Sequence, residues 1–392
     1  MLRVLARESL WLGPFLCIGV LSLGLFRALP HFPVPAHIRT VVDISGTPVR
    51  IALPFRGIVL APNSFPATYL EDTRSPDLLL YAGNTDLRKW FAKGVMSWVY
   101  PQILSNKLWN DKLFRATSSP FTEIESLIAY DASVYAGCGG PPDLVRRVGL
   151  PVFNCGGSPA KMRRVPILMK GVGCGSAPNL RWAYYPEIYL FPTLRTYSAL
   201  IGHAELAEPR IEAYCQVIDD LREELQPSTL TYRPRVLARA EEKGTLARAG
   251  LVDAEQRRYN PNDPEQLLAM DPDMIFLPQG SPREFDQDIR WQGLKAVRNR
   301  RVYRRPGLIE WWTAGVTFKP IETRWMAEVA HPDRLQPKVR QLLRDRMFAA
   351  FGYRLSDEQI DLQLHVAENS GAVGTERFTR NYQGAERPGP SK

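Results

Sequence analysis

Two cysteines show the clearest chemical pattern in this sequence. Cys138 and Cys155 each precede two glycines, and each follows a short apolar run, at 133–136 and 151–153. If these runs are neighbouring parallel strands, both thiols lie at the same edge of a sheet and close together. In an oxidising compartment we expect a Cys138–Cys155 disulfide in preference to two free thiols. Metal ligation is a less favoured alternative, because no CxxC motif or histidine cluster accompanies the pair.

Catalytic motifs are missing from the sequence. GxSxG, HExxH, P-loop and GxGxxG spacings do not occur. The segment 171–175 resembles a phosphate loop only in its glycines, because no lysine follows it. The five histidines share no ligand spacing. We therefore predict that the protein is not an enzyme and has no metal centre or cofactor of its own. A redox or metal-handling enzyme that uses Cys138 and Cys155 is the alternative.

The N-terminus has the pattern of an export signal. Arg3 and Arg7 precede an apolar run at 10–29, and a short basic region before such a run is typical of a signal peptide. Cleavage after Ala36 is favoured, and an uncleaved membrane anchor is the alternative. In both cases we expect the folded part of the chain to lie outside the cytoplasm.

The length and charge of the chain fit a folded protein of two domains. It has 392 residues, of which 45% are hydrophobic and 23% are charged, as is typical of globular proteins. The net charge of +9 is spread along the sequence rather than gathered in runs. Such a diffuse excess is weak support for nucleic-acid binding and suits an anionic ligand or a membrane surface equally well.

The sequence contains an internal repeat. Residues 125–134 align without gaps on residues 265–274, with Glu, Leu, Ala and Asp identical at matching positions. Both segments have the pattern of a short helix that leads into a buried strand, at 133–137 and at 274–277. A fainter similarity pairs 56–61 with 235–238. The repeat predicts two related α/β lobes, and the alternative is a chance similarity between two helix–strand joints.

A long helix is predicted between the lobes. Pro209 suits the first turn of a helix, and apolar residues follow it at helical spacing up to Leu225. A stiff connector of this kind permits only modest opening and closing. The predicted organisation is a signal or anchor at 1–36, an N-terminal lobe at 37–195, a linker with the spine helix at 196–232, a C-terminal lobe at 233–366 with a closing helix at 339–351, and a disordered tail at 367–392.

Two α/β lobes joined by one long helix, behind an export signal, resemble the periplasmic substrate-binding proteins of ABC importers for iron–siderophore complexes and vitamin B12. The segment 265–275 is the most specific match, and the segments 39–51, 291–303, 331–333 and 351–357 also look like the family. The resemblance implies two Rossmann-like lobes with a ligand cleft between them. It also implies a periplasmic monomer that delivers an iron–siderophore or a related metal chelate to permease subunits. Cobalamin- and haem-binding members of the family are the alternatives.

Loops at the carboxyl ends of the strands should line the cleft between the lobes. Aromatic rings and guanidinium groups in these loops suit a bulky, flat, anionic chelate, through stacking and charge-assisted hydrogen bonds. Core packing is the alternative for any one aromatic, and adjacent residues on a strand point to opposite faces, so that one of Trp311 and Trp312 would reach the ligand. The predicted ligand-binding residues are Asn63, Ser64, Trp98, Tyr100, Cys138, Tyr184, Tyr185, Arg239, Arg305, Trp311 and Trp312.

Two glutamates are predicted to dock on the permease. Members of the family carry one exposed glutamate per lobe that pairs with permease arginines, and Glu125 and Glu265 occupy matching positions of the internal repeat. Two carboxylates at opposite ends of a rigid body would fix its orientation as well as attract it. The alternative is that each is a first-turn glutamate favoured by the helix dipole. The expected partners are therefore the permease and a small chelate, without nucleic acid, and the membrane only through a retained anchor.

Overall fold

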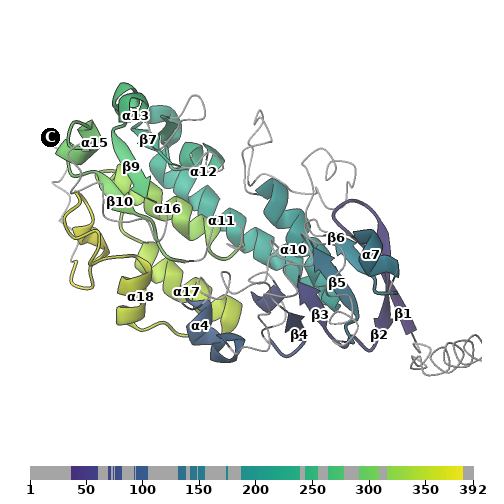
Figure 1. The fold of residues 1–392 in the computed structure, drawn as a ribbon. Coiled ribbons are helices and arrows are strands. Elements are labelled where there is room, and N and C mark those ends of the chain that lie inside the picture. The colour runs from purple at the N-terminus through teal and green to yellow at the C-terminus, as the bar shows by residue number, and fades with distance from the viewer. Residues whose placement is uncertain are drawn as a thin grey trace, which may run out of the picture.

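Two parallel sheets lie at opposite ends of an elongated molecule, with helices between them (Figure 1). The computed structural model describes residues 37–60, 69–71, 74, 76–81, 92, 94–104, 131–137, 142–147, 149–154, 174, 187–238, 243–254, 264–277, 291–308 and 316–382. In chain order the elements are β1 (His37–Val42), β2 (Pro48–Leu53), β3 (Ile58–Leu60), β4 (Leu79–Tyr81), α4 (Met96–Val99), η1 (Pro101–Leu104), β5 (Val134–Gly137), α7 (Pro142–Arg147), β6 (Val152–Asn154), α10 (Glu187–Ile201), η4 (Ala204–Leu206), α11 (Ala207–Leu225), η5 (Pro227–Thr229), β7 (Arg235–Leu237), α12 (Lys243–Arg248), β8 (Val252–Asp253), α13 (Pro264–Met270), β9 (Met274–Leu277), α15 (Lys295–Arg298), β10 (Val302–Arg304), α16 (Lys319–Ala330), α17 (Val339–Phe351), α18 (Asp357–Gln363) and η7 (Glu376–Phe378).

The two sheets have the same strand order. The sheet of the N-terminal lobe runs β4-β3-β5-β6, and that of the C-terminal lobe runs β10-β9-β7-β8. When the strands are numbered in chain order within each parallel sheet, and the second sheet is read from its other edge, both orders are second, first, third, fourth. All of these strands pair in parallel, and every residue of β3, β5 and β9 is buried, which explains their continuous apolar sequences. The predicted α/β fold with two related lobes is confirmed.

The internal repeat corresponds to the third strand of each lobe. Val134 and its aligned residue Met274 each lie opposite the first strand of their sheet, β3 and β7. The aligned residues Asp131 and Asp271 both have a left-handed backbone, with φ of 48° and 36°, a conformation that aspartate tolerates better than most residues. The similarity of the two segments therefore reflects the same backbone conformation at the entry to the third strand.

A pair of helices connects the lobes. The predicted helix at 209–225 is confirmed as α11, which begins two residues earlier, at Ala207. Gly202, with φ of 92°, follows the end of α10, and Gln226, with φ of 47°, ends α11 and donates its N–H to Arg222 O. The predicted linker at 196–232 begins inside α10, and α11 is the long helix that runs on into the C-terminal lobe, where it packs on α16.

One hydrophobic core extends through both lobes. It includes Phe153 and Tyr197 of the N-terminal lobe, whose ring centroids lie 6.1 Å apart, and Phe276 and Trp325 of the C-terminal lobe, at 5.5 Å. Every residue of α16 is buried. Because interiors of this kind are closely packed, the lobes cannot separate widely without exposing the core.

Residues 367–382 form an ordered layer on the C-terminal lobe, so the prediction of a disordered tail is wrong for them. Asn369 pairs with the main chain of the edge strand β10, accepting the N–H of Arg304 at 2.7 Å and donating to its carbonyl at 2.8 Å. Arg377 is 4% exposed and donates to Glu328 O at 2.8 Å. A polar composition favours exposure to solvent, but here the polar side chain of Asn369 covers the edge of a sheet.

No helix in the described ranges is both long and apolar enough to cross a membrane. The apolar run at 10–29 lies outside the described residues, so the predicted export signal stays a prediction.

Candidate functional site

The carboxyl ends of the parallel strands define where the predicted cleft should lie. Strands β3, β5 and β6 of the N-terminal lobe end at Leu60, Gly137 and Asn154. Strands β9 and β10 of the C-terminal lobe end at Leu277 and Arg304. Most of the residues that follow these ends lie outside the described part of the chain. This holds for the predicted ligand-binding residues Asn63, Ser64, Cys138, Tyr184, Tyr185, Arg239, Trp311 and Trp312, whose roles stay predictions.

Arg305, which directly follows β10, is one of the predicted ligand residues that the structure describes. It is buried, and its Nε donates to Glu322 Oε1 at 2.8 Å, while Lys319 Nζ donates to Glu322 Oε2 at 2.7 Å. Burial alone would raise the pKa of Glu322, but the charges and hydrogen bonds of Arg305 and Lys319 outweigh it and lower the pKa to about 2. In this structure Arg305 thus neutralises a buried carboxylate of its own lobe.

Trp98 and Tyr100 lie at the end of α4, where the N-terminal lobe meets α17. Trp98 is half-buried against the core, and Tyr100 is 6% exposed. The ring of Tyr100 packs edge-on against Phe351, with centroids 6.3 Å apart, and its hydroxyl donates to Leu70 O at 3.5 Å. Burial raises the pKa of Tyr100 to about 12. Both aromatic side chains therefore contribute to packing here, and their contact with a ligand stays a prediction.

A buried polar network connects both lobes through α11. Glu187 begins α10, and its Oε1 accepts hydrogen bonds from the hydroxyl of Tyr214 in α11 and from Arg248 in α12. The side chain of Glu187 is fully buried, and burial raises the pKa of Tyr214. Sequence reasoning missed this network because its three members are far apart in the chain and none of them belongs to a motif.

The disulfide of the described residues joins Cys174 to Cys215, with Cα atoms 4.8 Å apart. It attaches residue 174 to the middle of α11, among apolar side chains that include Phe191 and Ile211. The predicted Cys138–Cys155 pair lies outside the described residues and stays a prediction. Among the described elements, no strand ends directly before Cys174 or Cys215, so the reasoning from strand ends gave no signal for them.

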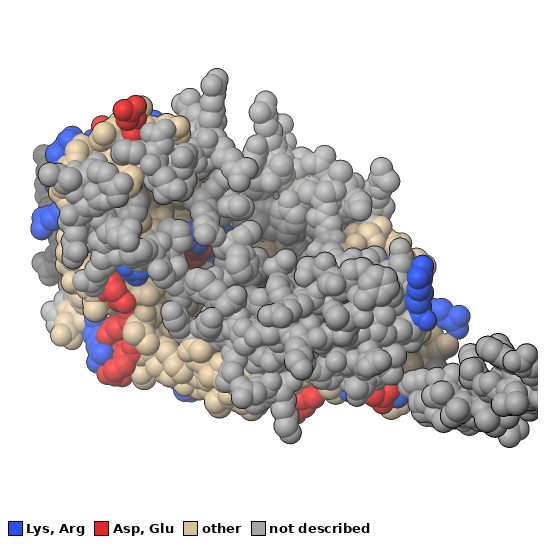
Figure 2. Space-filling view, viewed as in Figure 1, with Lys and Arg blue, Asp and Glu red and all other residues tan. Residues whose placement is uncertain are grey.

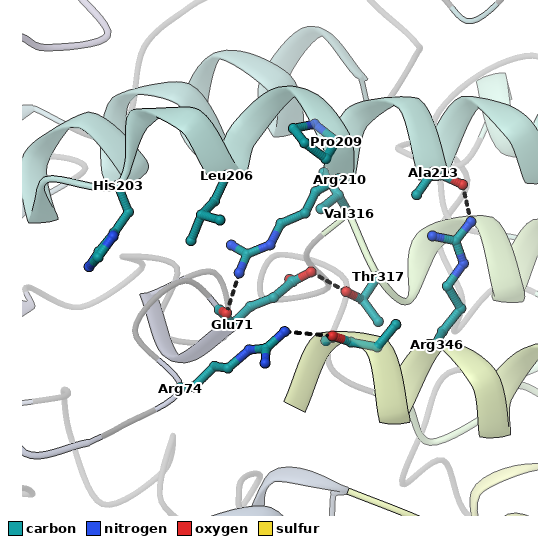
Figure 3. A pocket seen from close by; sticks show the side chains of 12 residues that line it. Glu71, Arg74, His203, Leu206, Pro209, Arg210, Ala213, Val316, Thr317 and Arg346 are labelled. Carbon is teal, nitrogen blue, oxygen red and sulfur yellow. Dashed lines mark hydrogen bonds between the residues drawn. The ribbon is translucent and has the colours of Figure 1, made fainter. Parts of the chain in front are cut away.

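A cavity of about 570 Å³ lies where the N-terminal lobe, α11 and α17 meet; we call it the junction cavity. Figure 3 shows α11 along one side and α17 along the other, with Glu71 and Arg74 entering from the N-terminal lobe. The cavity is lined by Glu71, Arg74, His203, Leu206, Pro209, Arg210, Ala213, Val316, Thr317, Arg346, Ala349 and Ala350. None of the residues that the sequence predicts for the ligand cleft is among them.

Hydrogen bonds fasten the walls of the junction cavity to one another. Arg210 of α11 donates to Glu71 O at 2.7 Å, and Arg74 donates to Ala349 O of α17 at 2.8 Å. Arg346 of α17 donates to Ala213 O of α11. Since every bond joins two different elements, the cavity has a defined shape at the contact between the lobes.

The charge of the junction cavity is predominantly positive. Glu71 is 2% exposed, and burial raises the pKa of its carboxyl group against the opposing influence of Arg210, of the hydroxyl of Thr317 and of Arg346. Burial lowers the pKa of both Arg210 and Arg346. Three guanidinium groups thus surround one carboxyl group. Sequence reasoning missed this cavity because its lining comes from segments that the chain brings together only in the folded state.

Glu265, one of the two predicted docking residues, lies in the first turn of α13 and is exposed. Acidic side chains are visible over this helix in Figure 2. Its position is compatible with docking and equally with the helix-dipole alternative. Glu125 lies outside the described residues, and the symmetric placement of the two glutamates stays a prediction.

Within the described part of the chain, no group of three or more His, Cys, Asp or Glu side chains could hold a metal ion.

Comparison with known proteins finds similarity in structure alone. The sequence matches no protein-family model and no curated protein. A solved periplasmic solute-binding protein from Veillonella parvula has a similar structure, with a TM-score of 0.66 and 18% sequence identity, over 85% of this chain and 99% of the other.

Two further solved structures are similar. The molybdate-binding protein MolA of Haemophilus influenzae, bound to molybdate, has a TM-score of 0.63 and 15% identity, over 81% of this chain and 99% of its own. CeuE of Helicobacter pylori, in a complex described as Ni-His, has a TM-score of 0.57 and 14% identity, over 84% and 99%. At these identities the similarity concerns the fold.

Proposed function

The chain has the two-lobed α/β fold of periplasmic solute-binding proteins, and from this we propose that it captures a ligand between its lobes and delivers it to an ABC transporter permease. The observation that carries the proposal is the pair of sheets with equal strand order, joined by α10 and α11. The carboxyl ends of strands in such sheets are where ligands of open α/β folds bind. The function is then binding, without chemical conversion of the ligand.

The proposed ligand is a metal chelate, with iron–siderophore complexes the first candidates. Among proteins of similar fold, one is bound to molybdate and another is in a complex with Ni-His. In this sequence Trp311 and Trp312 follow the last strand of the C-terminal lobe, and Arg239 follows its first. Aromatic faces and guanidinium groups suit large anionic chelates. Haem and cobalamin have comparable size and flat surfaces, so the experiment includes both.

The contacts between the lobes support capture with a small movement. Glu187, Tyr214 and Arg248 connect three helices through one buried carboxylate, and Tyr100 packs on Phe351. Wide opening would leave these polar groups without partners in a buried place, which is costly. The proposed capture therefore requires only limited opening of the cleft.

Tryptophan fluorescence tests the proposed ligand class. The purified protein is titrated with ferric catecholate and hydroxamate siderophores, haem, cobalamin, molybdate and nickel–histidine. We expect one chelate to change the emission in a saturable way. Because Trp311 and Trp312 are predicted at the cleft, Trp311→Phe or Trp312→Phe should weaken binding of that chelate.

Trp291→Phe is the matched control, because Trp291 is 7% exposed and packs in the C-terminal lobe against Leu294 and Ile275. This variant should bind the chelate as the unmodified protein does. The proposal fails if no compound of the panel binds, and the assignment of the cleft fails if both Trp311→Phe and Trp312→Phe bind normally.

Docking on the permease is tested with Glu125→Ala combined with Glu265→Ala, in proteoliposomes that hold the importer encoded beside this gene. We expect loss of transport with unchanged chelate affinity, because docking and capture use different surfaces. The control is Glu358→Ala, which removes a first-turn glutamate from α18 and so tests the helix-dipole alternative. Normal transport by the double variant would contradict the docking role.

A further inference from the structure

The junction cavity has the properties of a ligand site that chelate capture does not use. Its volume of about 570 Å³ is within the range of small-molecule pockets. Its lining combines three arginines with an apolar part, formed by Leu206, Pro209 and Val316. A site of this composition offers charge-assisted hydrogen bonds together with a surface for a carbon skeleton.

Two of its arginines make no ion pair with a carboxylate of the described residues. Arg74 donates to Ala349 O and Arg346 to Ala213 O, and among the described residues neither forms an ion pair with a carboxylate. A guanidinium has five N–H donors, so each arginine retains donors beyond the one that its carbonyl partner uses. Both side chains line the cavity (Figure 3).

The electrostatic surroundings of Arg346 favour a bound anion. Burial lowers the pKa of this guanidinium, and the charges of Glu71 and Asp220 oppose that effect only in part. A partly buried charge without a counter-charge is unfavourable, and an anion in contact with it removes the penalty. The carboxyl group of Glu71 also lines the cavity, but its Oε1 accepts from the hydroxyl of Thr317, and among the described residues neither Arg74 nor Arg346 forms an ion pair with it.

We propose that the junction cavity binds a small organic dianion, such as a dicarboxylate, with Arg74 and Arg346 each pairing with one anionic group. The apolar part of the lining favours an organic skeleton over an inorganic ion. Because Arg74 belongs to the N-terminal lobe and Arg346 to α17, the dianion would also connect the two lobes. This inference does not depend on the identity of the chelate or on transport.

Calorimetry and thermal unfolding of the purified protein test the site with succinate, succinamide and inorganic phosphate. We expect succinate to bind and to raise Tm, because a ligand that binds only the folded state stabilises it. Neutral succinamide should have no effect, and phosphate should bind at least about tenfold more weakly than succinate. Added salt should weaken succinate binding.

Variants locate the site. Arg74→Met and Arg346→Met should each weaken succinate binding by about tenfold or more, which corresponds to one charge-assisted hydrogen-bonded pair. Arg74 is exposed, so its variant remains informative even if Arg346→Met fails to fold. The matched control is Arg233→Met, since Arg233 is also exposed and also donates to a main-chain carbonyl, Pro227 O, at 2.8 Å. That variant should bind succinate normally.

Glu71→Gln distinguishes an anion from a cationic ligand. Removal of the carboxylate takes away repulsion of a dianion, so succinate binding should be unchanged or tighter. Weaker binding by this variant would contradict the proposal, as would absence of a Tm change with succinate at about 10 mM, well above a typical weak dissociation constant. Phosphate binding as tight as that of succinate would also contradict it. Chelate titrations of the same variants, followed by tryptophan fluorescence, separate this site from the cleft.

Discussion

The two lobes have the same strand order and the same left-handed residue before the third strand, Asp131 and Asp271, but they stabilise this joint with different groups. In the N-terminal lobe Ser133 Oγ accepts the N–H of Arg56 at 2.7 Å, and in the C-terminal lobe Asp273 Oδ2 accepts the N–H of Arg235 at 2.8 Å. Ser133 and Asp273 are aligned in the internal repeat. We infer that the fold requires a hydrogen-bond acceptor at this place, and that only the C-terminal lobe uses a charged one, Asp273.

The charge makes the joint of the C-terminal lobe part of a larger network. Lys295 Nζ donates to Asp273 Oδ1 at 2.5 Å. Burial alone would raise the pKa of Asp273, but the hydrogen bonds from Lys295, Tyr232 and Arg235 lower it below the ordinary value. The same lobe buries Glu322 between Arg305 and Lys319. Two lobes with one backbone plan thus differ in how strongly they depend on charge.

We expect the largest loss of stability when the buried charge of Glu322 is removed. Glu322→Ala leaves the guanidinium of Arg305 and the ammonium of Lys319 buried without their counter-charge, and we expect a loss of about 3–5 kcal/mol in the free energy of unfolding. Urea unfolding measures it. The control is the triple variant Arg305→Met, Lys319→Met and Glu322→Leu, which should be close to the unmodified protein in stability. A loss below about 1 kcal/mol for Glu322→Ala would contradict a stabilising charge cluster.

The pH dependence of stability follows from the same cluster. The folded-state pKa of Glu322, about 2, is below the ordinary value of 4.5. The ionised form therefore stabilises the fold above pH 4.5, and this contribution is lost as the pH falls from 4.5 to about 2. For this one group we expect about 3 kcal/mol. Urea midpoints between pH 6 and pH 3 should fall less steeply in the triple variant, and equal slopes would contradict the assignment.

Two variants at Asp273 separate the effect of a hydrogen-bond acceptor from the effect of a negative charge. Asp273→Ala removes the acceptor for the N–H of Arg235 and the partner of Lys295, and we expect a loss of about 2–3 kcal/mol. Asp273→Ser restores the group found in the N-terminal lobe and should recover part of this loss. Urea unfolding of both variants makes the comparison. Equal stability of the two variants would mean that the charge, and not the acceptor, is what the joint requires.

The same change is expected to cost less in the N-terminal lobe. Ser133→Ala removes one neutral acceptor from the N–H of Arg56, with an expected loss of about 1 kcal/mol. Ser133→Thr, which keeps the hydroxyl, is the control and should lose less. A loss for Ser133→Ala as large as that for Asp273→Ala would show that the lobes do not differ in their dependence on charge.

The sequence predicts those features of the lobes that local patterns determine. The buried strands at 133–137 and 274–277 and the helices at 209–225 and 339–351 agree with β5, β9, α11 and α17 to within two residues. Apolar spacing and the alignment of the repeat contain this information, because each element shows its own buried face in its own residues.

Contacts between distant segments are beyond such patterns. Glu187 accepts a hydrogen bond from Arg248, 61 residues away, and Arg74 donates one to Ala349 O, 275 residues away. Nothing near either residue specifies the partner, since the pairing depends on how the lobes pack around α11. The prediction of a disordered tail failed at Asn369 for the same reason, because the polar side chain of Asn369 bonds to the edge of β10 instead of to water.

We expect the smallest change in stability for asparagine variants of Asp131 and Asp271, whose backbones are both left-handed. These variants test whether the two aspartates have the same role in their lobes. Asp131 pairs with Arg56 at 2.8 Å on the surface, and Asp271 Oδ1 accepts the N–H of Lys295 at 2.9 Å. Asparagine tolerates this conformation and can accept the same N–H, so Asp131→Asn and Asp271→Asn should each change stability by less than about 1 kcal/mol. Alanine lacks this tolerance, and both Ala variants should lose about 1–2 kcal/mol. Thermal unfolding of the four variants measures these changes. If Asp131→Asn destabilises the protein as much as Asp131→Ala does, the exposed ion pair with Arg56, and not the backbone conformation, explains the aspartate at this position. The two lobes would then use their matching aspartates differently.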